Sequence, residues 1–362
     1  MTATNMCVEC TGDGECSGAT PVCNIATNTC AACGADNDCT SGICTTAGAC
    51  ADPSAIVYIA AGGADAGNCG SAAPCRTISY AVTQTSSTRN LISMGSGAYN
   101  DTFVIDGANA LDLHGHGAGI TSTTQGSAFV FDTATTIRDV TFDGGSGAIA
   151  TLVLGSGADY ALESVTVIHG AAGIESAGSV TANGLFVHDA GYAVALSGGS
   201  LSVDRATIYS SAYGIAATAP AMLQLTNAMM YGFSTGLAVD LTNITGATIS
   251  FSTIVGARAA SPATVDCPVG GTISASIVWA PSSAMVPVTG CNLVDSSIVG
   301  PTAVAGATDV DPAFANATGS DYDLGSNSPA IDQLPSGPSV DYKGDQRPQG
   351  ASYDIGADEY KP

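Results

Sequence analysis

Apolar residues recur at a nearly constant distance along the middle of the chain. When segments are aligned on the apolar residue that ends each of them, the aligned residues follow at steps of 25, 20, 21 and 22: Ile149, Ile174, Val194, Ile215 and Leu237. Seven and nine positions earlier, every segment has two more apolar residues: Phe142, Val167, Val187, Ile208 and Met230, and Val140, Val165, Leu185, Ala206 and Ala228. Apolar residues two apart form the inward face of a strand. A β-rich unit of this length that repeats predicts the coils of a parallel β-helix.

Shorter segments extend this pattern on both sides. Residues 56–59 and 91–94 predict strands, and residues 77–82 between them predict a short amphipathic helix that caps the first coil. Residues 253–256, 276–279 and 297–300 each combine a small hydroxyl residue, two apolar residues and a turn. We therefore expect an all-β solenoid over residues 53–305 and an acidic C-terminal cap region over residues 306–362.

Residues 1–52 differ from the rest, because nine of the 13 cysteines lie before residue 51. Eight of these form two sets of four with similar spacing: Cys10, Cys16, Cys23 and Cys30, then Cys33, Cys39, Cys44 and Cys50. Four cysteines allow three pairings, and the sequence does not choose among them. Disulfides are favoured over zinc, because the two-residue spacers typical of zinc sites link adjacent sets here. Cys7 is left over and suggests a preceding set in a longer array. Outside the small disulfide-rich domain, we expect Cys69 to pair with Cys75 and Cys267 with Cys291.

Composition predicts an extracellular or cell-surface protein, because a dense cysteine cluster does not normally stay oxidised in the cytosol. Residues 1–6 have neither the basic start nor the apolar stretch of an export signal, so we expect a trimmed mature form. Charged residues make up only 11 % of the chain, and the net charge is −23. Repulsion from phosphate excludes nucleic acid, and no apolar run is long enough for a membrane span. Ca²⁺ is the ion that such a surface attracts.

Two groups of motifs resemble known β-helix proteins. The N-terminal capping region of pectate-lyase-like proteins is similar to Tyr58-Ile59, Thr77-Ile78-Ser79-Tyr80-Ala81 and Gly97-Ala98-Tyr99-Asn100. Bacterial β-helix proteins of the choice-of-anchor Q group are similar to Asp311-Pro312-Ala313-Phe314, Asp321-Tyr322-Asp323-Leu324, Ser328-Pro329-Ala330-Ile331-Asp332, Asp345-Gln346-Arg347-Pro348 and Asp354-Ile355-Gly356-Ala357-Asp358-Glu359, in this order. The resemblance implies a secreted or surface-displayed right-handed parallel β-helix, and it implies no activity.

Outward positions of the middle coils carry aromatic side chains. His188, Tyr209 and Tyr231 stand six positions before the aligned residues, and Phe186 lies two before His188. Aromatic faces with polar neighbours suit sugar rings, and they also stabilise sheets by stacking on one another. A substrate-binding face and a purely structural ladder both remain open.

A second outward column is polar or charged: Arg138, Glu163, Asn183, Asp204 and Thr226. The favoured explanation is a ladder of charges that neutralise one another. In a polysaccharide lyase, calcium on Glu163 and Asp204 would acidify the proton beside a uronate carboxylate, and Arg138, Arg205 or His188 would remove it. Only eight Lys and Arg are present, which is few for a polyuronate groove. A glycosidase needs paired carboxylates, for which Asp139 and Asp143 are the nearest case.

Two further groups have both a chemical and a structural explanation. His114 and His116 share a strand face and suit a transition metal, but the sequence offers no third ligand, and a turn between coils is the alternative. The acidic residues from Asp309 to Glu359 either cap backbone amides or bind calcium. We expect this segment to close the C-terminal end of the solenoid.

These features favour a non-enzymatic surface protein whose rigid β-helix binds an extracellular glycan or neighbouring copies of itself, in adhesion or in a surface fibre. The alternative is a polysaccharide lyase or glycosidase on the same scaffold. The two differ in geometry, because a lyase needs Arg138 or Arg205, His188 and an acidic metal site within one groove.

Overall fold

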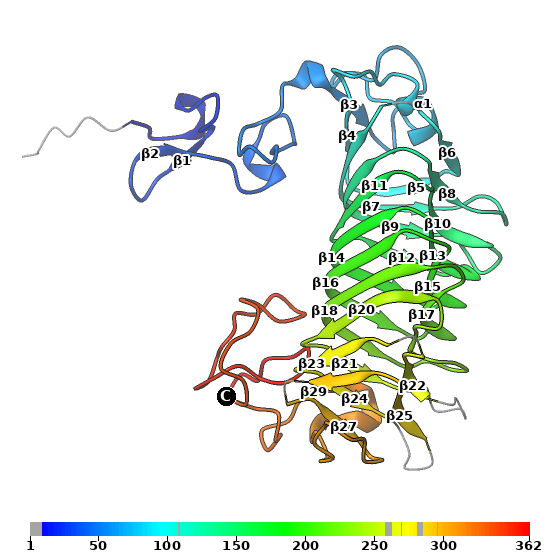
Figure 1. The fold of residues 1–362 in the computed structure, drawn as a ribbon. Coiled ribbons are helices and arrows are strands. Elements are labelled where there is room, and N and C mark those ends of the chain that lie inside the picture. The colour runs from blue at the N-terminus through cyan, green and yellow to red at the C-terminus, as the bar shows by residue number, and fades with distance from the viewer. Residues whose placement is uncertain (1–8, 108, 258–262, 269, 281–284, 295) are drawn as a thin grey trace, which may run out of the picture.

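The main body of the protein is a solenoid of parallel strands (Figure 1). The computed structural model describes residues 9–107, 109–257, 263–268, 270–280, 285–294 and 296–362, so Cys7 lies outside the described residues. Within them, two parallel sheets of 16 and nine strands form the solenoid. The prediction of an all-β parallel β-helix with a disulfide-rich N-terminal region is confirmed.

Each coil has a first and a second arm in the 16-stranded sheet and a third arm in the nine-stranded sheet. We call the outward surfaces of these arms face 1, face 2 and face 3. Strands that contain both a first and a second arm are β7 (Leu111–Thr121), β9 (Thr135–Asp143), β14 (Ser179–His188), β16 (Ser200–Tyr209) and β18 (Ala221–Tyr231). Separate first arms are β3 (Ile56–Ile59), β4 (Leu91–Met94), β11 (Asp159–Glu163), β20 (Ile244–Ser250), β23 (Thr272–Ser274) and β26 (Asn292–Val294). Separate second arms are β5 (Ala98–Asn100), β12 (Thr166–Ile168), β21 (Thr253–Val255), β24 (Ile277–Trp279) and β27 (Ile298–Gly300).

The third arms lie one above another in the nine-stranded sheet. They are β6 (Phe103–Ile105), β8 (Phe129–Phe131), β10 (Ala150–Leu154), β13 (Ala172–Ser176), β15 (Tyr192–Leu196), β17 (Tyr213–Ala217), β19 (Val239–Asp240), β22 (Ala263–Asp266) and β25 (Val286–Thr289). Helix α1 (Ile78–Val82) lies at the N-terminal end, where Ile78 and Ala81 are buried in the same core as the first strands. Among the described residues, no helix is both long and apolar enough to cross a membrane.

A left-handed backbone residue separates the first arm from the second. This residue has a positive φ in successive coils: Asp139, Ser164, Gly184, Arg205, Asn227, Phe251, Ala275 and Ser296. One residue in this conformation turns the chain sharply and leaves the parallel pairing intact on both sides of the bend. Side chains before and after the bend therefore lie on different faces, face 1 and face 2.

The core consists of ladders of inward side chains from successive coils. Phe142, Val167, Val187, Ile208 and Met230 pair in register and are fully buried, as the sequence predicts. The predicted alignment of Ile149, Ile174, Val194, Ile215 and Leu237 in the third arms is wrong at its first and last residues. Ile174 pairs with Leu152 instead of Ile149, and Ile215 pairs with Val239 instead of Leu237. Ile149 is 63 % exposed, because the glycine-containing loop after β9 is longer than the turns of the next coils.

Two disulfide-bonded modules precede the solenoid. Module 1 (residues 10–31) contains η1 (Asp13–Glu15), β1 (Val22–Asn24) and β2 (Thr29–Ala31), and module 2 (residues 33–50) contains η2 (Asp36–Asp38). In both modules the first cysteine pairs with the third and the second with the fourth: Cys10–Cys23, Cys16–Cys30, Cys33–Cys44 and Cys39–Cys50. Disulfides also join Cys69 to Cys75 and Cys267 to Cys291. A turn, η3 (Pro53–Ala55), leads from module 2 into β3.

The C-terminal region packs against the side of the last coils, whereas the sequence predicts that it covers their end. It contains β28 (Phe314–Asn316), η4 (Ala317–Gly319) and β29 (Asp321–Leu324). Its Leu324 and Ile355 share an apolar cluster with Ile277 and Ile298, which are outward residues of face 2. The backbone N–H of Ala357 donates to Thr253 Oγ1 at 3.0 Å. The outward column of face 2 is apolar in these last coils, and the C-terminal region shields its side chains from solvent.

Buried carboxylates in this C-terminal region accept hydrogen bonds from backbone amides. Asp341, Asp354, Asp358 and Glu359 each do so, for example Asp358 Oδ2 from Leu324 N at 2.8 Å. Burial raises the pKa of Asp358 to about 6, and nearby Asp323 adds to the effect while Lys343 opposes it. Compared with the unfolded chain, the folded protein therefore favours the neutral form of the Asp358 carboxyl group.

We expect stability to decrease through Asp358 as the pH rises. Between the ordinary pKa of 3.8 and about 6, the folded state retains a proton that the unfolded state releases, so rising pH destabilises the fold. The contribution is roughly 2–3 kcal/mol over this interval. Urea unfolding of Asp358→Asn and wild type from pH 4 to 7 measures it, with exposed Asp159→Asn as the control. The stability of D358N relative to wild type should rise with pH, and a difference that does not change with pH would contradict this assignment.

Candidate functional site

Face 1 carries a chain of adjoining hollows. The first, of about 550 Å³, lies between module 2 and the solenoid and is lined by Asp36, Arg138 and Glu163 among others. The second, of about 240 Å³, shares Glu163 with the first and continues to Asp204. The third, of about 490 Å³, shares Ser202 with the second and extends to Thr248. Together they form a groove that runs across successive coils, which we call the face 1 groove.

The floor of the face 1 groove presents similar groups from coil to coil, about 4.8 Å apart. One outward column consists mostly of hydroxyl and amide side chains: Thr181, Ser202, Gln224 and Thr248. The neighbouring column contains Glu163, Asn183, Asp204 and Thr226, in the register that the sequence predicts. Met222, which is 60 % exposed, adds an apolar surface in the third hollow. A regular ladder of this kind suits an extended polymer with repeating hydroxyl groups.

Arg138 is held by two carboxylates at the N-terminal end of the groove. Its Nε donates to Asp112 Oδ1 at 3.1 Å, and its Nη1 donates to Glu163 Oε2 at 2.5 Å. Burial alone would raise the pKa of Asp112, but His114 and Arg138 outweigh it and hold that pKa below its usual value. The guanidinium is therefore neutralised by protein carboxylates, as a charge-neutralising ladder requires.

Glu163 and Asp204, the predicted calcium ligands, line the same hollow but lie two strands apart, in β11 and β16. Two strand spacings correspond to about 9.6 Å between backbones, with Asn183 between them. Glu163 is paired with Arg138, and Asp204 Oδ1 accepts a hydrogen bond from Asn227 Nδ2 at 3.0 Å. Calcium at this position stays a prediction.

The predicted aromatic residues lie on face 2 and form a continuous stack. The ring centroids of His188 and Tyr209 are 4.8 Å apart, and those of Tyr209 and Tyr231 are 5.6 Å apart. The C-terminal region extends this row of rings, since the ring centroids of Tyr322 and Tyr231 are 5.2 Å apart, with their planes tilted by 53°. Burial, the largest cause, raises the pKa of Tyr231. Phe186 is 44 % exposed on this face, whereas Met229, which lies in the same outward column, is buried.

The structure does not bring all the residues of a lyase into one groove. Arg138, Glu163 and Asp204 line the face 1 groove, and the bend residue Arg205 donates to Asn183 Oδ1 at its floor. His188 is separate from them, because it lies on face 2 with its Nδ1 2.8 Å from Asp189. Asp139 is likewise a bend residue, and Asp143 Oδ1 lies 2.7 Å from His169 Nδ1, with which it forms an ion pair or hydrogen bond. The side chains of Arg138, Arg205, His188 and Asp143 are thus each engaged with another protein group.

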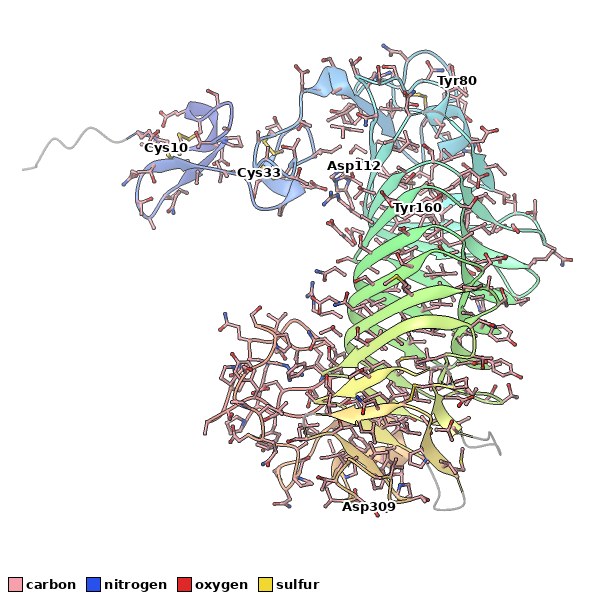
Figure 2. All side chains as sticks on the ribbon, in the orientation of Figure 1. Cys10, Cys33, Tyr80, Asp112, Tyr160 and Asp309 are labelled. Atoms are coloured by element: carbon pink, nitrogen blue, oxygen red, sulfur yellow. A yellow bond between two sulfur atoms is a disulfide. The ribbon has the colours of Figure 1, made fainter. Side chains whose placement is uncertain are left out.

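The hydroxyl and amide column of the face 1 groove was not predicted from the sequence. These residues stand two positions before the Asn183 column, so strand alternation places both columns on one face. The wall formed by module 2 was not predicted either, because it comes from a distant part of the sequence. Figure 2 shows Asp112 on the flank of the solenoid that faces the module containing Cys33.

Comparison with known proteins shows the fold alone. No family model and no curated protein sequence matches this chain. The crystal structure of pectate lyase Pel9A is similar, with a TM-score of 0.53 and 14 % sequence identity over 84 % of this chain and 96 % of that one. The chain thus has a pectate-lyase-like parallel β-helix fold. The choice-of-anchor Q resemblance of the C-terminal region stays a prediction.

Proposed function

We propose that this chain is an extracellular protein that binds a neutral polysaccharide along the face 1 groove and does not cleave it. The run of three adjoining hollows across successive coils is the observation that carries this proposal. Repeating hydroxyl and amide groups match the repeating hydroxyl groups of an extended glycan, and Met222 offers an apolar contact for a sugar face. Six disulfides support an oxidising, extracellular location.

A neutral glycan fits the charges of this groove better than a polyuronate. Arg138 is already paired with Asp112 and Glu163. Asp204 offsets the charge of Arg205, which donates to Asn183 at the floor of the same groove. An anionic polymer would therefore meet net repulsion unless calcium bridged the two. Adhesion to a glycan-coated surface is the role that follows from binding without cleavage.

Substitutions in the groove test where the glycan binds. We expect Gln224→Ala with Thr248→Ala to weaken binding by roughly tenfold or more, because two hydrogen-bonding groups are lost from one face. The control is Thr207→Ala with Phe186→Ala on face 2, which should bind as wild type does. Affinity electrophoresis in gels that contain a panel of neutral and uronate polysaccharides measures both, with calcium and with a chelator. A loss confined to the face 2 variant would move the site to face 2 and contradict the groove.

A further inference from the structure

Asp36 of module 2 meets two histidines of β7 at the upper end of the solenoid. Asp36 Oδ2 lies 2.6 Å from His114 Nδ1 and 3.2 Å from His116 Nε2. One oxygen and two imidazole nitrogens thus converge at one point. The third ligand that is absent from the local sequence of His114 and His116 comes from a residue 78 positions earlier than His114.

An irregular bend in β7 places His116 at this point. The pairing of β7 with β9 shifts between His114 and Ala118, so this coil has extra residues where the others have one bend residue. His116 has a φ of 48°, and a Cβ at Gly115 would lie 2.4 Å from Asp139 O. Glycine at position 115 is therefore required for the bend, which directs the His116 side chain toward module 2.

The nitrogen of each ring that faces away from Asp36 is next to another protein oxygen. His116 Nδ1 lies 2.8 Å from Met94 O, and His114 Nε2 lies 3.1 Å from Asp112 Oδ1. Histidines that bind metals almost always have such a carboxylate or carbonyl partner on the second nitrogen. His114 is 1 % exposed, and its Nε2 is close to Asp112 without the alignment of a hydrogen bond, so the partner on the second nitrogen is complete for His116 and only near for His114.

Module 1 has an aspartate, Asp13, at the position that corresponds to Asp36. A comparison of the two shows which oxygen of Asp36 has a structural role and which is available to a metal. Asp13 Oδ1 accepts from Cys23 N at 2.7 Å, and Asp36 Oδ1 accepts from Cys44 N at 2.8 Å. One oxygen of each carboxylate thus stabilises its own module in the same way. The second oxygen of Asp36 is left to face the two histidines.

We propose that Asp36, His114 and His116 bind one divalent transition-metal ion of the zinc class, which fixes module 2 against face 1. Two imidazoles and one carboxylate are a donor set that zinc accepts, with a water in the fourth position. His116 Nε2 would give up its 2.8 Å contact with Gly42 O to bind the metal. Tetrahedral bonds of about 2.0 Å put ligand atoms roughly 3.3 Å apart. The His116 contact, at 3.2 Å, is close to this separation already, and the His114 contact, at 2.6 Å, has to open by about 0.7 Å. This proposal is independent of glycan binding.

Metal titration of the full chain tests the proposal. Cys7→Ser is introduced throughout, because a thiol also binds zinc. After treatment with a chelator, the protein with intact disulfides is titrated with Zn²⁺ in a calorimeter and with Co²⁺ in a visible spectrophotometer. We expect one equivalent of each ion, with visible Co²⁺ bands that report nitrogen and oxygen ligands.

Variants assign the site. Asp36→Asn and His116→Gln should each weaken Zn²⁺ binding at least tenfold, while Asp13→Asn, His169→Gln and His188→Gln bind as the parent does. These positions are preferred to His114, whose burial puts folding at risk. Circular dichroism confirms the fold of each variant. The proposal would be overturned if the parent did not bind one equivalent of metal, or if D36N and H116Q bound Zn²⁺ as tightly as the parent does.

Discussion

Arg347→Met should destabilise the C-terminal region by roughly 3–5 kcal/mol, because it leaves buried carboxylates without their cation. The Arg347 side chain is fully buried, and its Nη1 lies 3.6 Å from Glu359 Oε2. It also donates to the carbonyl oxygens of Asp354 at 3.1 Å and of Gly356 at 2.8 Å. Methionine retains much of the apolar stem and removes the charge and all these bonds.

Hydrogen exchange over residues 309–362 measures this effect locally, since the C-terminal region can open without unfolding the solenoid. Lys361→Met, which removes an exposed partner of Asp345, is the matched control and should change little. Arg347→Met combined with Glu359→Gln should recover part of the loss. Unchanged exchange in R347M would show that this cation does not hold the region in place.

Leu152→Ala should cost roughly 2–5 kcal/mol, whereas Ile149→Ala should change stability by less than about 0.5 kcal/mol. Leu152 is fully buried between Phe129 and Ile174 in the third-arm ladder, so its truncation leaves a cavity. Ile149 is 63 % exposed in the preceding loop. Denaturant unfolding of the two variants compares them directly. Equal losses, or a larger loss for I149A, would contradict the register of β10.

The columns before the turn were predictable, because strand alternation and a bend of one residue keep the first two arms the same length in most coils. The Arg138–Thr226 column and the Phe142–Met230 column are both in the predicted register. The turn into the third arm varies in length. Leu152 follows Phe142 by 10 positions, Ile174 follows Val167 by 7, and Val239 follows Met230 by 9. Alignment on one apolar residue per coil cannot detect such a change.

The candidate sites depend on contacts between distant segments, which periodicity does not encode. His114 and His116 were visible as a pair, but Asp36 reaches them only when module 2 docks on the solenoid. The C-terminal region likewise covers the side of the last coils, although the apolar outward residues Ile277 and Ile298 were a sign that this side is covered. The charged column was identified in sequence, and the groove in which it lies required its neighbours from β14, β16 and β18.

The central claim, that the face 1 groove binds a polysaccharide without cleaving it, is tested most directly by measuring binding and product in one sample. The protein is incubated with each glycan of a neutral and uronate panel, with and without calcium. The bound fraction, new reducing ends and the ultraviolet absorbance of unsaturated ends are then recorded together. We predict retention on at least one neutral polysaccharide and no products from any glycan. Release of reducing or unsaturated ends would make the chain a glycosidase or lyase, and failure to bind any glycan would contradict the groove as a binding site.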